Sequence, residues 1–272
     1  MKHKSFGWAL AFASVLCLPQ NSAVAAEATW SAIKPAIFQE RVIHHSRELI
    51  KLEAPYRTLD DRVIPIRVNT TLTGGRSIKS LTLIADDNPM PVIGVFRPAS
   101  DVSSFGIGLN IRLDGTSIIR AVVETEDGSL YMAKKLVKTS GQGACASPPV
   151  SDLDKIDETI GQMAFNDVTA KGAATGFTSI ARRGRLKLMH PNLTGLQMNQ
   201  VTLLHIPARY IDKLTVWQGK RELFSVETGI TLSENPELEF EYRLDGAEDL
   251  TVEASDTEGT KFKTSFPLGP AS

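Results

Sequence analysis

Cys145 is the residue in this chain whose type and surroundings point most clearly to chemistry. It lies in the segment Gly141-Gln142-Gly143-Ala144-Cys145-Ala146-Ser147-Pro148-Pro149. Glycine and alanine have little side chain with which to cover a thiol, and the two prolines stiffen the chain that follows. We therefore expect a solvent-exposed sulfur on a pliable loop, with a flexible arm that comprises Gly141, Gly143, Ala144 and Ala146. An unpaired, exposed thiol of this kind is a candidate for covalent attachment of another group.

The N-terminal residues predict a secretory signal peptide over 1–26. Lys2 and Lys4 give a positive start, an apolar run follows from Phe6 to Leu18, and small residues at 23–25 fit a cleavage site. The apolar run is short for a membrane anchor, which is the alternative. Cleavage removes Cys17, one of the two cysteines, so Cys145 would be the single thiol of the mature chain. We expect no disulfide within that chain and no membrane association.

Composition and charge favour a globular chain that does not bind nucleic acid. The formal net charge of −1 becomes about −3 when the two lysines of the signal peptide are lost, which provides no general basic field. Apolar residues make up 42% of the sequence, enough for ordinary packed cores. The mature chain of roughly 245 residues is long enough for two domains of about 100 residues each.

The apolar periodicity predicts an all-β chain with a short helical segment at its start. Helical spacing runs from Trp30 to Leu52, and alternation typical of strands begins after Pro55. Strands are expected at 63–68, 81–84, 92–96, 105–113, 118–125 and 130–137 in a first sandwich domain over 27–138. A second sandwich domain over 185–272 is expected to contain strands at 186–189, 201–206, 211–217, 222–226, 237–244, 250–254 and 261–266.

The segment between these domains, 139–184, reads as the cysteine arm followed by a partly helical linker. Ile156, Ile160 and Met163 are spaced for one short amphipathic helix. The stretch 170–176, rich in glycine and alanine, has the composition of a loose linker.

The order of motifs in the first half resembles SoxY, a periplasmic sulfur-carrier subunit. The matching motifs are Leu52-Glu53-Ala54-Pro55, Val63-Ile64-Pro65-Ile66, Asp87-Asn88-Pro89-Met90-Pro91, and the run through Tyr131, Ala133, Lys134, Val137 and Lys138 into the glycine arm. The second half resembles SoxZ, the partner of SoxY. Its motifs are His190-Pro191, Thr194-Gly195-Leu196, Ile206-Pro207-Ala208, Tyr210-Ile211, Ser233-Glu234-Asn235-Pro236 and Phe240. One polypeptide with both halves is similar to the SoxYZ-like carriers associated with quinoprotein dehydrogenases.

This resemblance implies two immunoglobulin-like sandwiches that dock together and a cysteine that carries oxidised sulfur intermediates between periplasmic enzymes. Two departures put thiosulfate oxidation itself in question. Gln142, Ala144 and Ala146 replace parts of the Gly-Gly-Cys-Gly-like tail of SoxY. The arm is also tethered at both ends, because the chain continues into the second half.

The residues around Cys145 favour a carrier over an enzyme. A nucleophilic enzyme needs its own base and oxyanion site, and no histidine adjoins Cys145 in the sequence. His44, His45, His190 and His205 follow no metal-ligand spacing, so we expect neither metal nor cofactor. The expected partners are periplasmic redox or sulfur-processing enzymes that load and unload Cys145, and a disulfide-linked homodimer could also form. An adaptor module with a vestigial cysteine and a redox enzyme or sulfur transferase remain the alternatives.

Overall fold

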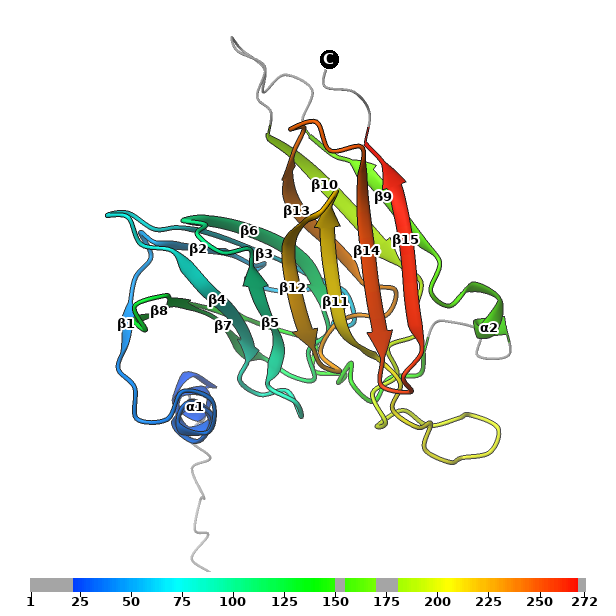
Figure 1. Ribbon diagram of the computed structural model, residues 1–272. Coiled ribbons are helices and arrows are strands. Elements are labelled where there is room, and N and C mark those ends of the chain that lie inside the picture. The colour runs from blue at the N-terminus through cyan, green and yellow to red at the C-terminus, as the bar shows by residue number, and fades with distance from the viewer. Residues whose placement is uncertain (1–21, 150–154, 170–180, 269–272) are drawn as a thin grey trace, which may run out of the picture.

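The structure consists of two large β-sheets that face each other and extend through both halves of the chain (Figure 1). This computed structural model describes residues 22–149, 155–169 and 181–268. The first sheet has the strand order β1-β8-β7-β4-β5-β12-β11-β14-β15, and the second has the order β2-β3-β6-β13-β10-β9. Most of the predicted signal peptide and the 170–176 linker lie outside the described residues.

The strands of the first sheet are β1 (Ile43–His45), β4 (Ile78–Ala85), β5 (Val92–Pro98), β7 (Ser117–Thr125), β8 (Leu130–Val137), β11 (Ile211–Gln218), β12 (Arg221–Thr228), β14 (Asp249–Asp256) and β15 (Lys261–Pro267). Those of the second are β2 (Ile50–Glu53), β3 (Ile64–Thr71), β6 (Ser104–Ile111), β9 (Met163–Asp167), β10 (Ala181–Leu188) and β13 (Glu237–Arg243). The prediction of an all-β chain with two immunoglobulin-like sandwiches is confirmed.

Backbone pairing joins the two halves in both sheets. In the first sheet β5 pairs with β12, so that Gly94 lies opposite Thr228 and Pro98 opposite Phe224. In the second sheet β6 pairs with β13, where Leu109 lies opposite Leu238. Buried residues from both halves belong to one hydrophobic cluster. The two halves therefore dock together, as the resemblance implied, through both sheets and a shared core.

Strand β7 lies where the first sheet is covered on both faces. Its residues are buried at almost every position instead of at alternate ones. Ile119, Ala121 and Val123 face the main core, whereas Val122 faces the opposite side, where it packs with the helix α1 (Ser22–Phe38). Near-continuous apolar sequence is the usual mark of a strand buried on both faces.

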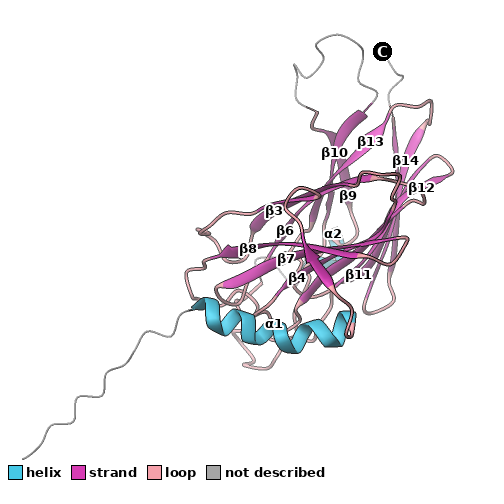
Figure 2. Ribbon diagram, turned by 90° about the vertical axis from the view of Figure 1, so that its left-hand side faces the viewer, coloured by secondary structure: helices cyan, strands magenta, loops and turns pink. Residues whose placement is uncertain are grey.

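The helix α1 lies across the outer face of the first sheet (Figure 2). Trp30 and Phe38 from the helix pack with Ile84, Val122, Leu130 and Met132 of the sheet. Below them, Arg120 forms a fully buried ion pair with Asp86 (Nη2 to Oδ2, 2.7 Å), and its guanidinium lies 4.2 Å from the Trp30 ring centroid. The predicted cleavage site at 23–25 lies within α1, upstream of these packing residues.

The predicted helical segment over 30–52 is wrong beyond Phe38. Gln39 has a positive φ of 55°, which ends the helix, and β1 then pairs in parallel with β8. The predicted strand at 201–206 is also wrong, because this segment is a loop. No helix among the described residues is long and apolar enough to cross a membrane.

The segment 139–184, which the sequence suggested as arm and linker, contributes more structure than expected. It contains α2 (Ile156–Thr159), β9 and the first residues of β10. Phe165 in β9 stacks on Phe240, with 6.0 Å between ring centroids. Gly184 makes room for it, because a Cβ there would lie 2.3 Å from the Phe165 ring. Strand β9 therefore belongs to the packed edge of the second half.

We expect the Asp86→Asn variant to lose stability, because it removes the ionised carboxylate that pairs with the buried Arg120 guanidinium. The expected loss in the free energy of unfolding is about 3–5 kcal/mol, measured by denaturant unfolding. Glu253→Gln provides the control, because its partner Lys263 is exposed and such pairs contribute about 0–1 kcal/mol. Equal effects of the two substitutions would contradict this assignment.

Candidate functional site

The cysteine arm, residues 139–149, lies against residues from both halves of the chain. Cys145 is fully buried, with 0% of its surface exposed. The expectation of a solvent-exposed sulfur is therefore wrong, whereas the flexibility of the arm stays a prediction. The reason is that other parts of the fold cover Ala144 and Cys145, whereas Gly141, Gln142 and Ala146 of the same arm are exposed. Cys145 belongs to neither of the two hydrophobic clusters of the described residues.

The first half of the chain holds the arm through the turn after β6. The backbone N–H of Ala144 donates to the carbonyl oxygen of Leu113 at 3.2 Å, and that of Cys145 donates to Asp114 Oδ1 at 3.3 Å. Gly143 permits this approach, because a Cβ there would lie 3.2 Å from Asp114 Oδ1 and its φ is +70°. Gly143 thus serves close packing of the arm against Asp114 in this state.

The base of the arm is fixed by Asp61. Its carboxylate accepts the backbone N–H of Ser140 at 3.0 Å and the Ser140 hydroxyl at 2.5 Å. Asp61 is itself buried. This contact sets the point from which the arm would have to turn if it left the protein surface.

The second half of the chain closes over the arm with two buried side chains, Thr194 and Gln197, which we call the clasp. The Thr194 hydroxyl donates to the carbonyl oxygen of Cys145 at 2.6 Å. Gln197 Nε2 donates to the carbonyl oxygen of Ser147 at 3.1 Å. Gln197 Oε1 also accepts the backbone N–H of Thr194 at 3.0 Å. The two halves together therefore enclose the cysteine.

The surroundings of Cys145 keep its thiol protonated. Burial is the main cause that raises its pKa to about 11; the Asp114 carboxylate adds to the rise and Arg112 opposes it. Arg112 is almost fully buried, and burial lowers its own pKa. Because the thiolate is the reactive form of cysteine, the enclosed sulfur is a poor nucleophile at neutral pH.

Asn88 positions the residues next to the arm and ties them to the second half. Its Nδ2 donates to the carbonyl oxygen of Arg112 at 2.9 Å and to Thr231 Oγ1 at 3.1 Å. Its Oδ1 accepts the backbone N–H of Asp114 at 3.0 Å. In the sequence Asn88 stood out only as part of a motif that resembles SoxY, whereas the structure shows that it forms a buried bridge between the halves.

Two hollows lie beside the arm, but neither reaches the sulfur. One measures about 370 Å³ and the other about 300 Å³. Both are lined by Asp60, Arg62, Ala144, Ser147 and Pro148, and Cys145 lines neither. A group attached to the Cys145 sulfur could therefore be accommodated only if the arm moved.

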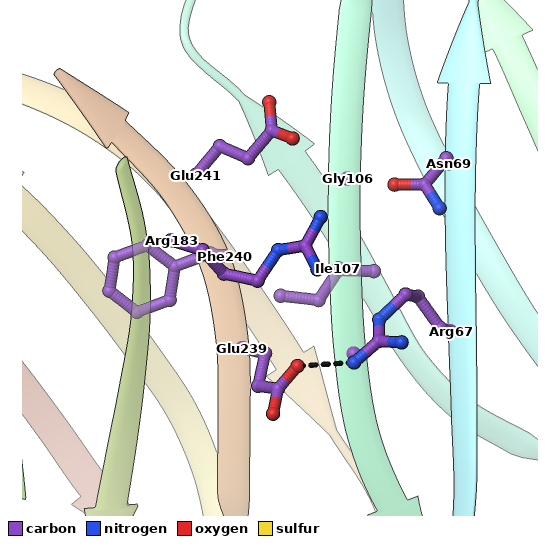
Figure 3. Close-up of a pocket in the computed structure, with 9 residues that line it drawn as sticks. Arg67, Asn69, Gly106, Ile107, Arg183, Glu239, Phe240 and Glu241 are labelled. Carbon is purple, nitrogen blue, oxygen red and sulfur yellow. Dashed lines mark hydrogen bonds and ion pairs between the residues drawn. The ribbon is translucent and has the colours of Figure 1, made fainter. Parts of the chain in front are cut away.

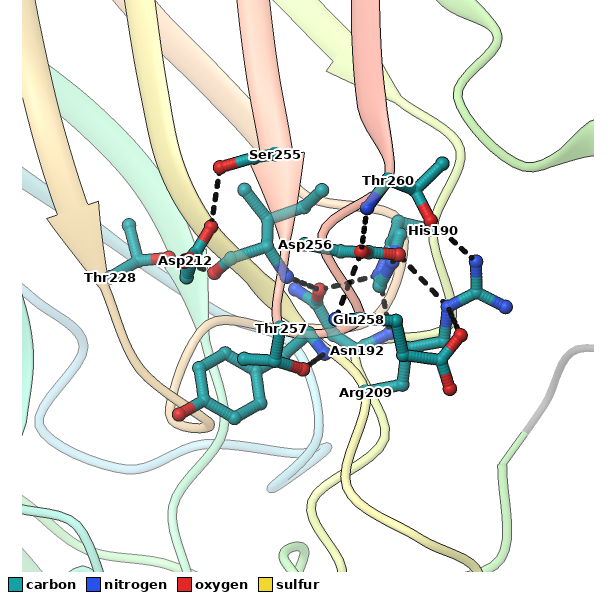
Figure 4. A network of polar contacts seen from close by, with 12 residues as sticks. His190, Asn192, Arg209, Asp212, Thr228, Ser255, Asp256, Thr257, Glu258 and Thr260 are labelled. Carbon is teal, nitrogen blue, oxygen red and sulfur yellow. Dashed lines mark hydrogen bonds and ion pairs between the residues drawn. The ribbon is translucent and has the colours of Figure 1, made fainter.

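The loop that carries the clasp is braced by a buried polar network (Figure 4). His190 Nδ1 lies 2.8 Å from Asn192 Oδ1, which also accepts the backbone N–H of Ile211 at 3.0 Å. Asp256 accepts a hydrogen bond from Arg209 at 2.9 Å and lies 3.6 Å from His190 Nε2. Burial lowers the pKa of His190. These residues hold the 190–194 segment in place, and His190 therefore has a structural role.

A further hollow on the second sheet has no room for a ligand (Figure 3). It measures about 10 Å³, the size of a single water site. Glu239 at its edge pairs with both Arg67 and Arg185. In the described residues no group of His, Cys, Asp and Glu side chains is arranged to hold a metal ion.

Sequence reasoning identified Cys145 but missed the residues that enclose it. Asp61, Asp114 and Gln197 have no motif of their own, and each reaches the arm from a distant part of the chain. Thr194 does lie in a motif that marked the resemblance of the second half, and that was the only signal in the sequence.

Comparisons with known proteins divide the chain at the arm. Residues 34–145 match the family model of the sulfur oxidation protein SoxY, and residues 181–267 match that of the sulphur oxidation protein SoxZ. The first match ends on Cys145 itself. No curated protein is a significant match to the sequence.

Among the solved structures that match part of this chain are a sulfur carrier and a superoxide reductase. The sulfur carrier protein SoxY from Chlorobium limicola f thiosulfatophilum is 22% identical, with a TM-score of 0.36 over 42% of this chain and 98% of that one. A superoxide reductase (neelaredoxin) from Ignicoccus hospitalis is 18% identical, with a TM-score of 0.29 over 36% of this chain and 95% of that one. At such TM-scores neither likeness carries a functional argument.

We expect Cys145 of the native protein to react with iodoacetamide at pH 8 at least roughly a hundredfold more slowly than a synthetic peptide of residues 139–149. The raised pKa alone accounts for about that factor, because it lowers the thiolate fraction. The native rate should keep rising with pH toward about 11, whereas the peptide rate should level off nearer the ordinary pKa. Equal rates for protein and peptide would show that the thiol is not enclosed.

The Thr194→Val variant should speed this alkylation about five- to tenfold, because loss of the buried hydrogen bond from its hydroxyl to the Cys145 carbonyl oxygen, worth about 1 kcal/mol, favours opening of the arm. Thr202→Val is the matched control. Thr202 lies on the same loop and accepts a bond only from the backbone N–H of Leu204 among the described contacts. An equal rise in both variants would mean that the loop had been loosened in general.

Proposed function

We propose that this chain, which contains a SoxY domain and a SoxZ domain of the sulfur-oxidation carrier family, is a periplasmic protein that carries a small sulfur-containing group on Cys145. The observation that carries the proposal is the position of the SoxY match, which ends on the cysteine. Cys145 is also the one cysteine that remains once the predicted signal peptide, with Cys17, is removed. Its partners would be periplasmic enzymes that load and unload this sulfur.

Loading requires both an open arm and a redox partner. If the Cys145 sulfur joins the outer sulfur of an anion such as thiosulfate, one S–S bond forms and the thiol releases its proton and two electrons. A periplasmic enzyme with an electron-accepting cofactor must take up those electrons. This division of labour agrees with a chain whose cysteine has no neighbouring histidine in the sequence and a pKa raised to about 11. The protein itself would then be a carrier and no enzyme.

The enclosed arm gives the unloaded carrier a protected state. Hydrogen bonds from Ala144 and Cys145 to the first half and from the clasp to the arm account for the closure. The arm has no helix or strand of its own, so it can open without disrupting either sheet. A disulfide-linked homodimer, expected from an exposed thiol, would also require this opening.

The full burial of Cys145 favours a second candidate. The chain would be an adaptor module of a periplasmic quinoprotein dehydrogenase system, in which the cysteine no longer reacts. An adaptor needs no exposed thiol, whereas a carrier must open its arm in every cycle. The two functions therefore differ in whether the sulfur is ever modified.

Intact-mass measurement of the protein isolated from the periplasm of its own host, grown on reduced sulfur compounds, separates the two. A carrier should show an added mass on Cys145 that reductant removes and that the Cys145→Ser variant lacks. An unmodified mass under all growth conditions, together with full activity of Cys145→Ser in the host, would establish the adaptor instead.

A further inference from the structure

The loop over residues 196–206 displays apolar side chains to solvent next to the cysteine arm. The exposed fractions are 89% for Val201 and 69% for both Leu203 and Leu204. Leu196 and Met198 are also exposed. The segment contains no Lys, Arg, Asp or Glu. Large apolar side chains gathered at one surface site usually mark a place of interaction.

The loop is a formed structure that holds these side chains outward. Asn199 Oδ1 accepts the backbone N–H groups of Val201 and Thr202, each at 2.9 Å. The backbone N–H of Asn199 donates to the carbonyl oxygen of Leu204 at 2.9 Å. Leu203 has a φ of +57°, a conformation that is costly for leucine. Strained backbone of this kind concentrates at functional positions.

The same loop carries the clasp at its base. Gln197 joins the two, because its side chain holds Ser147 and Thr194 while its carbonyl oxygen accepts the backbone N–H of Ile206 at 2.8 Å. The Thr194 hydroxyl accepts the backbone N–H of Leu196 at 3.1 Å and donates to Cys145. A displacement of the loop would therefore act directly on the bonds that enclose the cysteine.

We propose that the 196–206 loop is the docking surface for the enzymes that act on Cys145, and that docking opens the clasp and frees the arm. This inference rests on the proposed carrier function. The occupant is an apolar patch on such an enzyme, at the entrance through which the freed arm reaches its active site. Charge pairing is not needed, because the loop carries no Lys, Arg, Asp or Glu.

The small area of this apolar loop surface indicates a partner enzyme that binds only transiently. Five exposed side chains on one loop offer a few hundred Å², whereas a stable interface buries about 800 Å² on each partner. A second copy of the chain held by this loop alone would dissociate readily. A carrier that must visit several enzymes needs such short-lived contacts, and release of the clasp on contact would limit exposure of the sulfur to the docked state.

The test compares loading of Cys145 in the host by intact mass, after transfer of cells to thiosulfate. The loop variant carries Val201→Ser, Leu203→Ser and Leu204→Ser, and the control carries Val42→Ser, another exposed apolar residue in the first half of the chain. We expect the loop variant to load about tenfold more slowly than the wild type and the control to load normally. For the purified loop variant alone, the rate of Cys145 alkylation and the thermal unfolding should equal those of the wild type. Such a result shows that the substitutions leave the enclosed state of Cys145 intact.

A second variant tests the link between docking and opening. Thr194→Val added to the loop variant should recover part of the lost loading rate, because the clasp then opens without help. Equal loading of wild type and loop variant would overturn the inference and leave the carrier function standing. An absence of any adduct on wild-type Cys145 would overturn both.

Two further results would also overturn it by assigning the loop another occupant. One is a homodimer seen by light scattering that the three serines dissociate. The other is co-sedimentation with vesicles of phosphatidylethanolamine and phosphatidylglycerol that the three serines abolish.

Discussion

Backbone pairing between the two halves is the constraint on which the rest of this structure depends. Because β5 pairs with β12 and β6 with β13, both sheets pass through the junction without a break. The relative position of the halves is therefore set by hydrogen-bonded registers, in addition to side-chain packing. Asn88 adds a buried polar bridge at the same junction, between Asp114 in the first half and Thr231 in the second.

The enclosed cysteine is a consequence of that rigid junction. The turn after β6 offers Leu113 and Asp114 to one side of the arm, and the loop after β10 offers Thr194 and Gln197 to the other. Neither half alone could enclose the sulfur. A tethered arm between two fixed domains thus has a defined resting place, in which the buried, protonated thiol is kept from disulfide exchange.

The sequence predicted most strands because alternation of apolar residues survives wherever one face of a sheet meets the core, as at Ile64, Ile66 and Val68 in β3. The prediction of a strand at 201–206 was wrong because the apolar residues there lie exposed in a loop. The prediction of a helix was wrong after Phe38 because β1 pairs with β8 in that part of the chain. For the site, composition identified Cys145 but gave the wrong exposure. Burial there depends on Asp114, Thr194 and Gln197, which contact the arm across 31 to 50 residues of sequence, and no local pattern encodes such contacts.

Hydrogen–deuterium exchange reports directly on whether the arm is closed, because the backbone N–H groups of Ser140, Ala144 and Cys145 are the donors that close it. Reaction with tetrathionate places an S–SO₃⁻ group on the Cys145 sulfur and releases thiosulfate, which gives a loaded form for comparison. Residues 140–147 should exchange at least about tenfold more slowly in the free-thiol protein than in the loaded one, with β4 and β7 unchanged. Exchange of the arm in the free-thiol protein at the rate of an unstructured peptide would show that the arm is not held closed.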